Sequence, residues 1–85
     1  MAVPSLRTAG VLLAATGAAH FAAPKRFEAV TALAFPDNTR QWTYRNGATE
    51  LALGLALTVP RTRKLGVAGV AAYTAWLGAR ARAGR

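Results

Sequence analysis

His20 and Glu50 are the side chains of this 85-residue sequence whose types and positions are best suited to chemistry. His20 is the only histidine, and Glu50 is one of only three acidic residues. Each lies at the edge of an apolar run that is long enough to suggest a membrane span. An ionisable group inside a membrane usually has a function. The pair predicts either a proton or quinone head-group contact, or a structural ion pair that locks two helices together.

Other kinds of chemistry find little support in the sequence. One histidine and one glutamate are too few ligands for a metal site. The absence of cysteine excludes thiol catalysis and disulfides. There is no Gly-rich phosphate loop, no Ser-His-Asp arrangement and no pair of carboxylates at a useful spacing. We therefore expect a protein that is not an enzyme and that holds no cofactor or metal.

The elements that would position His20 and Glu50 are helices with unusual surfaces. Residues 8–24 and 65–79 carry no charged residue, so a helix in either stretch has no charged, solvated face. The net charge is nevertheless +8, and 53% of the residues are hydrophobic. Basic residues between apolar runs are typical of a membrane protein whose loops lie beside anionic lipid head groups.

The pattern predicts an all-α integral membrane protein forming one domain over residues 1–85. Transmembrane helices are expected at about 6–23, 40–59 and 63–80, with a short interfacial helix at about 25–35. The first of these would rise about 27 Å, near the thickness of a hydrocarbon core. Small residues recur at every fourth position, which allows helix backbones to approach closely. The expected location is a bacterial inner membrane, crossed several times.

A second group of residues is suited to contacts with lipid or with a partner protein. Aromatic side chains gather on one expected side of the membrane, which we interpret as the docking side. A basic turn on the other side is either a topology determinant or a lipid phosphate contact. The candidates are Phe21, Phe27, Trp42, Tyr44, Trp76, Arg61, Arg63 and Lys64.

Two different interpretations stay open. A basic, alanine-rich helical domain could bind nucleic acid through its phosphates, but the uncharged helices argue against a nucleic-acid partner. Arg7 and the apolar run after it also fit a signal peptide. Phe21, however, occupies a position where cleavage prefers a small residue.

Several short motifs follow one another in the order found in one known family of proteins. The first span closes with an HF-x-x-P-x-x-F block, a Gly-x-x-Glu opens the second, and a Pro-Arg-x-Arg turn precedes the third. The matching residues are His20, Phe21, Pro24, Phe27, Asn46, Gly47, Glu50 and the stretch 57–65. Over roughly residues 17–66 the chain thus resembles the DoxX-like small membrane proteins. The resemblance implies a helical inner-membrane protein of quinone-linked or thiol and oxidative-stress redox assemblies, usually with one span more.

The alanine-rich helices would gain their stability by packing against other helices. We therefore expect a non-catalytic accessory, stabilising or regulatory subunit of a larger bacterial inner-membrane complex, such as a lipid importer or a respiratory assembly. The expected partners are that integral membrane complex and anionic lipids, and a homo-oligomer is an alternative. The resemblance implies another function, a redox-associated subunit that contacts quinone near His20 and Glu50.

Overall fold

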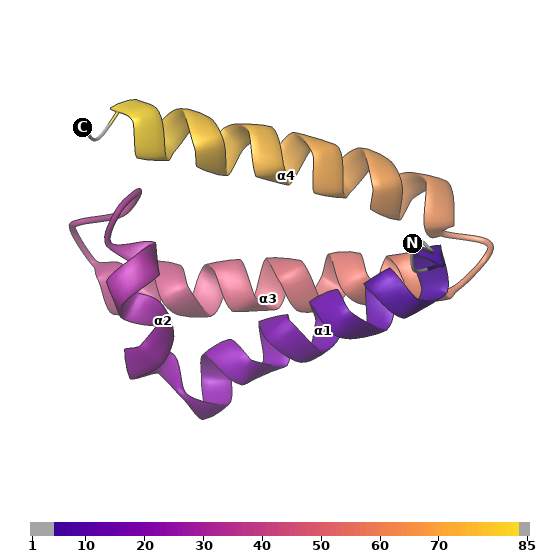
Figure 1. The fold of residues 1–85 in the computed structure, drawn as a ribbon, viewed down its shortest axis with the longest axis horizontal. Helices are drawn as coiled ribbons and strands as arrows, with labels where there is room; N and C mark the ends of the chain where they lie inside the picture. Colours follow the sequence, from indigo (N-terminus) through magenta and orange to yellow (C-terminus); the bar gives the residue numbers. More distant parts are fainter. Residues whose placement is uncertain (1–4, 84–85) are drawn as a thin grey trace, which may run out of the picture.

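The computed structural model describes residues 5–83, and within this range the chain forms four α-helices (Figure 1). They are α1 (Leu6–Ala22), α2 (Pro24–Thr31), α3 (Thr39–Thr58) and α4 (Arg63–Ala83). Helix α4 runs alongside α3, and α1 crosses α3 obliquely on another side. The short helix α2 and the loop after it cover one end of α3.

Local sequence signals explain where the helices begin and end. The Ser5 hydroxyl accepts a hydrogen bond of 3.1 Å from the Thr8 amide and caps α1. Pro24 occupies the first turn of α2, where no amide donor is missed. Asn38, with φ of 56°, adopts the left-handed conformation directly before α3. Pro60 follows the end of α3 and disfavours a helical conformation of the residue before it.

Helices α1 and α3 meet through glycines. A β-carbon placed on Gly10 would lie 2.6 Å from the carbonyl oxygen of Gly54. One placed on Gly17 would lie 2.5 Å from the carbonyl oxygen of Gly47. Residues larger than glycine at positions 10 and 17 would force the backbones of α1 and α3 apart at these two points of contact. This close approach makes the α1–α3 contact the most extensive in the fold.

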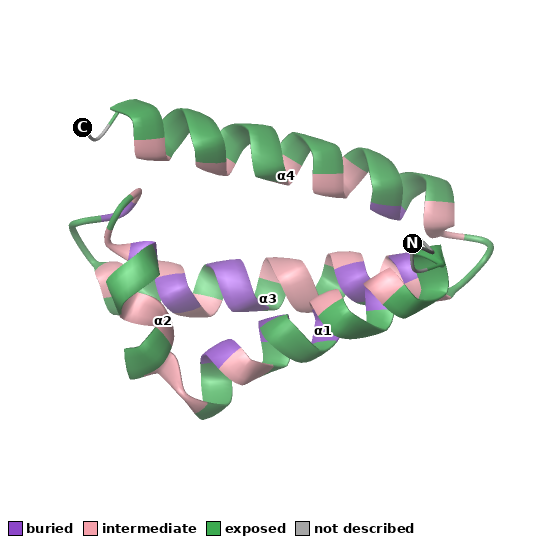
Figure 2. Cartoon of the chain, viewed as in Figure 1, coloured by how far each residue is buried: buried purple, intermediate pink, exposed green. Residues whose placement is uncertain are grey.

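The apolar core is small. Among the described residues, the buried apolar side chains are Ala14, Phe35 and Leu57. Phe35 is the largest, with 1% of its surface exposed, and it lies in the loop between α2 and α3. Thr43 is fully buried, and its hydroxyl donates to the Thr39 carbonyl at 2.9 Å. Much of the outward surface of α4 is exposed (Figure 2).

The expected membrane architecture is wrong. Within residues 5–83, no helix combines the length and the apolar character needed to cross a bilayer. Helix α1 has 17 residues and rises about 25 Å, and α3 opens with polar turns. Arg63, Lys64, Arg80 and Arg82 lie inside α4. These findings overturn the three transmembrane helices, the interfacial role of α2 and the multi-pass location in a bacterial inner membrane.

Candidate functional site

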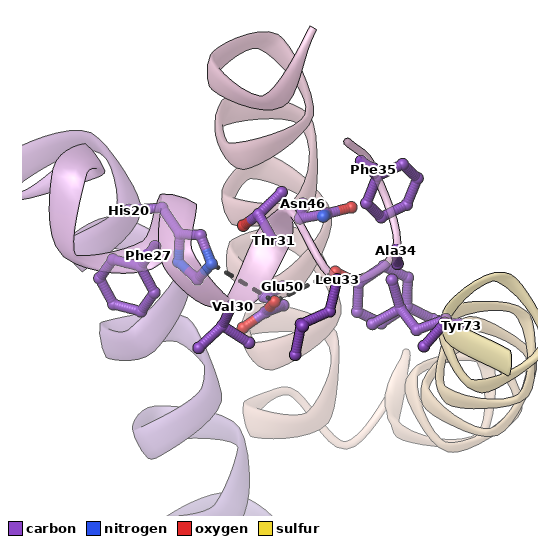
Figure 3. A pocket seen from close by; sticks show the side chains of 12 residues that line it. His20, Phe27, Val30, Thr31, Leu33, Ala34, Phe35, Asn46, Glu50 and Tyr73 are labelled. Atoms are coloured by element: carbon purple, nitrogen blue, oxygen red, sulfur yellow. Dashed lines mark hydrogen bonds and ion pairs between the residues drawn. The ribbon is translucent and has the colours of Figure 1, made fainter. Parts of the chain in front are cut away.

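His20, near the end of α1, meets Glu50 and Tyr73, which lie near the middle of α3 and of α4 (Figure 3). His20 Nε2 lies 3.7 Å from Oε2 of Glu50, and the Tyr73 hydroxyl donates to that same oxygen at 3.1 Å. The His20 and Glu50 side chains are only 7% and 14% exposed. The structure thus brings together the two residues selected from the sequence and adds a third.

The His20 ring is held in one orientation. Its Nδ1 lies 2.7 Å from the Thr16 carbonyl oxygen. Because a carbonyl can only accept, Nδ1 must carry the proton of that bond. The ring also stacks on Phe27, with centroids 3.8 Å apart. Nε2 therefore faces Glu50 as a free acceptor when the imidazole is neutral, and as an ion-pair partner when it is protonated.

Tyr73 acts as a hydrogen-bond donor at this site. Burial raises the pKa of its phenol far above the ordinary value, and the negative charge of Glu50 and the hydrogen bond to it raise that pKa further. The phenol therefore stays protonated over the physiological pH range. It supports the Glu50 carboxylate without being able to serve as a base.

A pocket of about 210 Å³ opens beside these three residues. Its polar end carries His20, Glu50 and the largely buried side chain of Asn46. Its walls are mainly apolar and come from α2, the loop after α2, and α4. Val30 and Leu33 also line the pocket, and because they are 69% and 68% exposed, the pocket is open to the surface on their side. The lining contains no lysine or arginine.

This arrangement is suited to binding. The described part of the chain contains no group of three or more His, Cys, Asp and Glu side chains that could hold a metal ion. His20 and Glu50 can accept hydrogen bonds, and the apolar walls can bury the body of a small molecule. The pocket thus offers an acceptor-rich end and an uncharged interior.

Beside the pocket, an aromatic cluster encloses Phe35. Phe35 stacks on Trp42 with centroids 4.4 Å apart, and the Trp42 and Trp76 rings lie 5.8 Å apart. The Arg80 guanidinium lies 4.4 Å from the centre of the Phe35 ring. Trp42 and Trp76 were both candidates for partner contacts in the sequence. In the structure they pack mainly against other side chains of the same chain, although Trp76 is still 40% exposed.

The remaining candidates lie in two places. Phe21 stacks on Tyr44 with centroids 5.4 Å apart and is 48% exposed. Arg63 donates from Nε to a carbonyl at the end of α3, at 2.9 Å, and so closes the turn between α3 and α4. Arg61 and Lys64 are exposed on that turn. The basic turn lies at the opposite end of α4 from Trp76 and Arg80.

The outer faces of α1 and α4 expose large apolar side chains. On α1, Val11 and Leu12 are 53% and 59% exposed, and on α4, Leu65 and Val67 are 73% and 45% exposed. Both faces fall in the stretches of the sequence without charged residues. In Figure 2 these two helices are largely exposed on their outward sides.

A role for Tyr73 was not predicted from the sequence. Its signal is nevertheless visible, since it is the one ionisable residue within the uncharged stretch 65–79. Phe35 was not predicted as a core residue, because the sequence placed it at the end of an interfacial helix at about 25–35. In the structure α2 ends at Thr31, and Phe35 lies in the loop after it.

The fold and the pocket define a small four-helix domain that is suited to binding. The chain belongs to the family described as "Domain of unknown function (DUF8561)", which matches residues 9–83. No curated protein and no solved structure matches it. This match replaces the resemblance to the DoxX-like proteins, which is wrong. Pro24 and Pro60, on which that resemblance relied, begin one helix and follow another, a use common to many helical proteins.

Proposed function

We propose that this chain is a non-catalytic accessory subunit that binds a larger protein through the outer faces of α1 and α4. The observation that carries the proposal is the exposure of large apolar side chains, such as Leu12 at 59% and Leu65 at 73%, in the parts of α1 and α4 that fall within the uncharged stretches 8–24 and 65–79. Large exposed apolar surfaces typically mark sites of protein interaction.

The small core supports the same proposal. Gly66 is the one buried residue of α4, so this helix gains little from its own domain. Covering an exposed leucine or valine side chain contributes about 1.5–3 kcal/mol. Burial of both outer faces against a partner would therefore add stability that the isolated domain lacks.

The charges indicate the chemistry of the partner. The net charge is +8, and Arg7, Arg61, Lys64 and Arg82 are exposed near the ends of α1 and α4. A complementary surface would present apolar helix residues bordered by Asp and Glu. Pairing of two copies is less favourable, because each carries the same charge excess.

Photo-crosslinking in the native cell tests this proposal. A photoreactive amino acid replaces Leu12 or Val67, and Lys25, which is exposed on α2, provides the control position. We expect both apolar positions to form an adduct with the same larger protein, on a helix rich in Asp and Glu. The control position should form none.

Three outcomes would contradict the proposal: an adduct with a second copy of the chain, an adduct with lipid, or no adduct at either apolar position. Binding of the identified protein is then measured with purified components. Leu12→Glu and Val67→Glu should each weaken it about tenfold or more, and Lys25→Glu should have little effect.

A further inference from the structure

We propose that the pocket beside His20, Glu50 and Tyr73 binds a small apolar amine, whose ammonium group lies against Glu50 and His20. This site is separate from the outer faces of α1 and α4, so it does not depend on the proposed partner.

The first argument is an unbalanced charge. The Glu50 side chain is 14% exposed, and no lysine or arginine lines the pocket around it. Its neighbours there are the Tyr73 phenol and the His20 imidazole, and neither carries a positive charge while the imidazole is in its neutral form. A buried carboxylate without a cationic partner is costly. A ligand that brings a positive charge would remove this cost.

The second argument is the pattern of donors and acceptors. Because Nδ1 of His20 donates to Thr16, Nε2 of the neutral ring presents a lone pair toward Oε2 of Glu50, 3.7 Å away. This separation is too long for a direct hydrogen bond, and both atoms are then acceptors. An ammonium group has several protons and can donate to both, whereas a hydroxyl group has one. A carboxylate ligand would be repelled.

The third argument concerns the size and the walls of the pocket. An apolar cavity of about 150 Å³ accepts benzene, and this pocket measures about 210 Å³. It therefore has room for one ring and a short arm. Phe27, Phe35 and Tyr73 supply aromatic surface, which attracts both an apolar ring and a cation. Figure 3 shows these side chains around the Glu50 carboxylate.

The test uses three probes that share a ring and a one-carbon arm: benzylamine, benzyl alcohol and benzoate. Each is titrated into the full chain by calorimetry and by NMR. Benzylamine should bind saturably and shift the resonances of His20 and Tyr73. Benzyl alcohol should bind about tenfold or more weaker, and benzoate should not bind.

Two variants test whether benzylamine binds in the pocket beside Glu50. Glu50→Gln should lower the affinity for benzylamine about tenfold or more and leave the affinity for benzyl alcohol nearly unchanged. Glu28→Gln is the matched control, because Glu28 pairs with Arg40 at 2.7 Å and does not line the pocket. It should change neither affinity.

Benzoate that binds as tightly as benzylamine would overturn the proposal, as would no saturable binding of benzylamine or an unchanged affinity in Glu50→Gln. If Glu50→Gln fails to fold by circular dichroism, the three probes on the unaltered chain decide alone. Loss of this binding site would leave the crosslinking result for the outer faces untouched, so failure of one proposal is distinguishable from failure of the other.

Discussion

The Tyr73 hydroxyl donates a hydrogen bond of 3.1 Å to Glu50 and thereby joins α4 to α3 across 23 positions of the sequence. It also places the α4 wall of the pocket beside the carboxylate. Because Gly66 is the one buried residue of α4, this bond is an important part of what fixes the position of that helix.

Removing this hydrogen bond should destabilise the domain. We expect Tyr73→Phe to lower the free energy of unfolding by about 1–2 kcal/mol, since a bond to a charged, largely buried acceptor is lost. Urea denaturation followed by circular dichroism measures the change. Thr74→Ala, at the exposed neighbouring position, should stay within about 0.5 kcal/mol of the natural chain. Equal effects at both positions would contradict the role given to the phenol.

The same residue predicts an alkaline loss of stability. The folded state raises the pKa of Tyr73, so the folded chain binds this proton more tightly than the unfolded chain does. The resulting stabilisation is fully present below the ordinary phenol pKa of about 10 and is lost as the pH rises above it.

Denaturation midpoints measured on both sides of that pH test this expectation. Tyr73→Phe should show a smaller alkaline decrease than the natural chain, while Tyr44→Phe, which retains Tyr73, should keep the larger one. Identical profiles for all three proteins would show that Tyr73 does not couple to folding.

We expect replacement of glycine by alanine to have opposite effects at two positions, one inside the contact between α1 and α3 and one outside it. Gly54→Ala places a methyl group 2.6 Å from the Gly10 carbonyl oxygen and should cost about 1–3 kcal/mol through overpacking. At Gly78, the added methyl group meets nothing within 4 Å. Gly78→Ala should therefore stabilise the domain by about 0.5–1 kcal/mol. Thermal unfolding of both variants checks the sign, and a stabilising Gly54→Ala would refute the close approach of α1 and α3.

Phe35 should be the most sensitive core position. Phe35→Ala removes a side chain that is 1% exposed and stacks on Trp42, at an expected cost of about 3–5 kcal/mol. Tryptophan fluorescence should also change, because Trp42 and Trp76 both lie against that ring. Leu33→Ala, in the same loop but at a residue that is 68% exposed, is the control. A small loss at Phe35, similar to that at Leu33, would argue against the aromatic cluster.

Helix positions were accessible from the sequence because their signals are local. The expected helical ranges 6–23, 40–59 and 63–80 lie close to α1, α3 and α4, since prolines, polar turns and apolar runs fix such boundaries. The expectation that His20 and Glu50 could meet, because they lie on the same side of two adjacent helices, follows from the same reasoning. Their distance of 3.7 Å required the structure.

What surrounds each helix could not be predicted from such local signals. Runs without charge, such as residues 65–79, were interpreted as lipid-facing, but alanine and glycine make such runs only weakly apolar. The part that Tyr73 plays depends on how α4 lies along α3, and no periodicity within one helix specifies that arrangement. The burial of Phe35 likewise depends on Trp42, Trp76 and Arg80 converging on one loop.

The weak attachment of α4 has a consequence for exchange with solvent. A helix held along one side, by few buried groups, opens at a lower free energy than the glycine-packed pair α1 and α3. Its backbone amides should exchange for deuterium before those of α3. Each opening would also withdraw Tyr73 and Leu77 from the pocket, so detachment of this helix would remove one wall of the pocket.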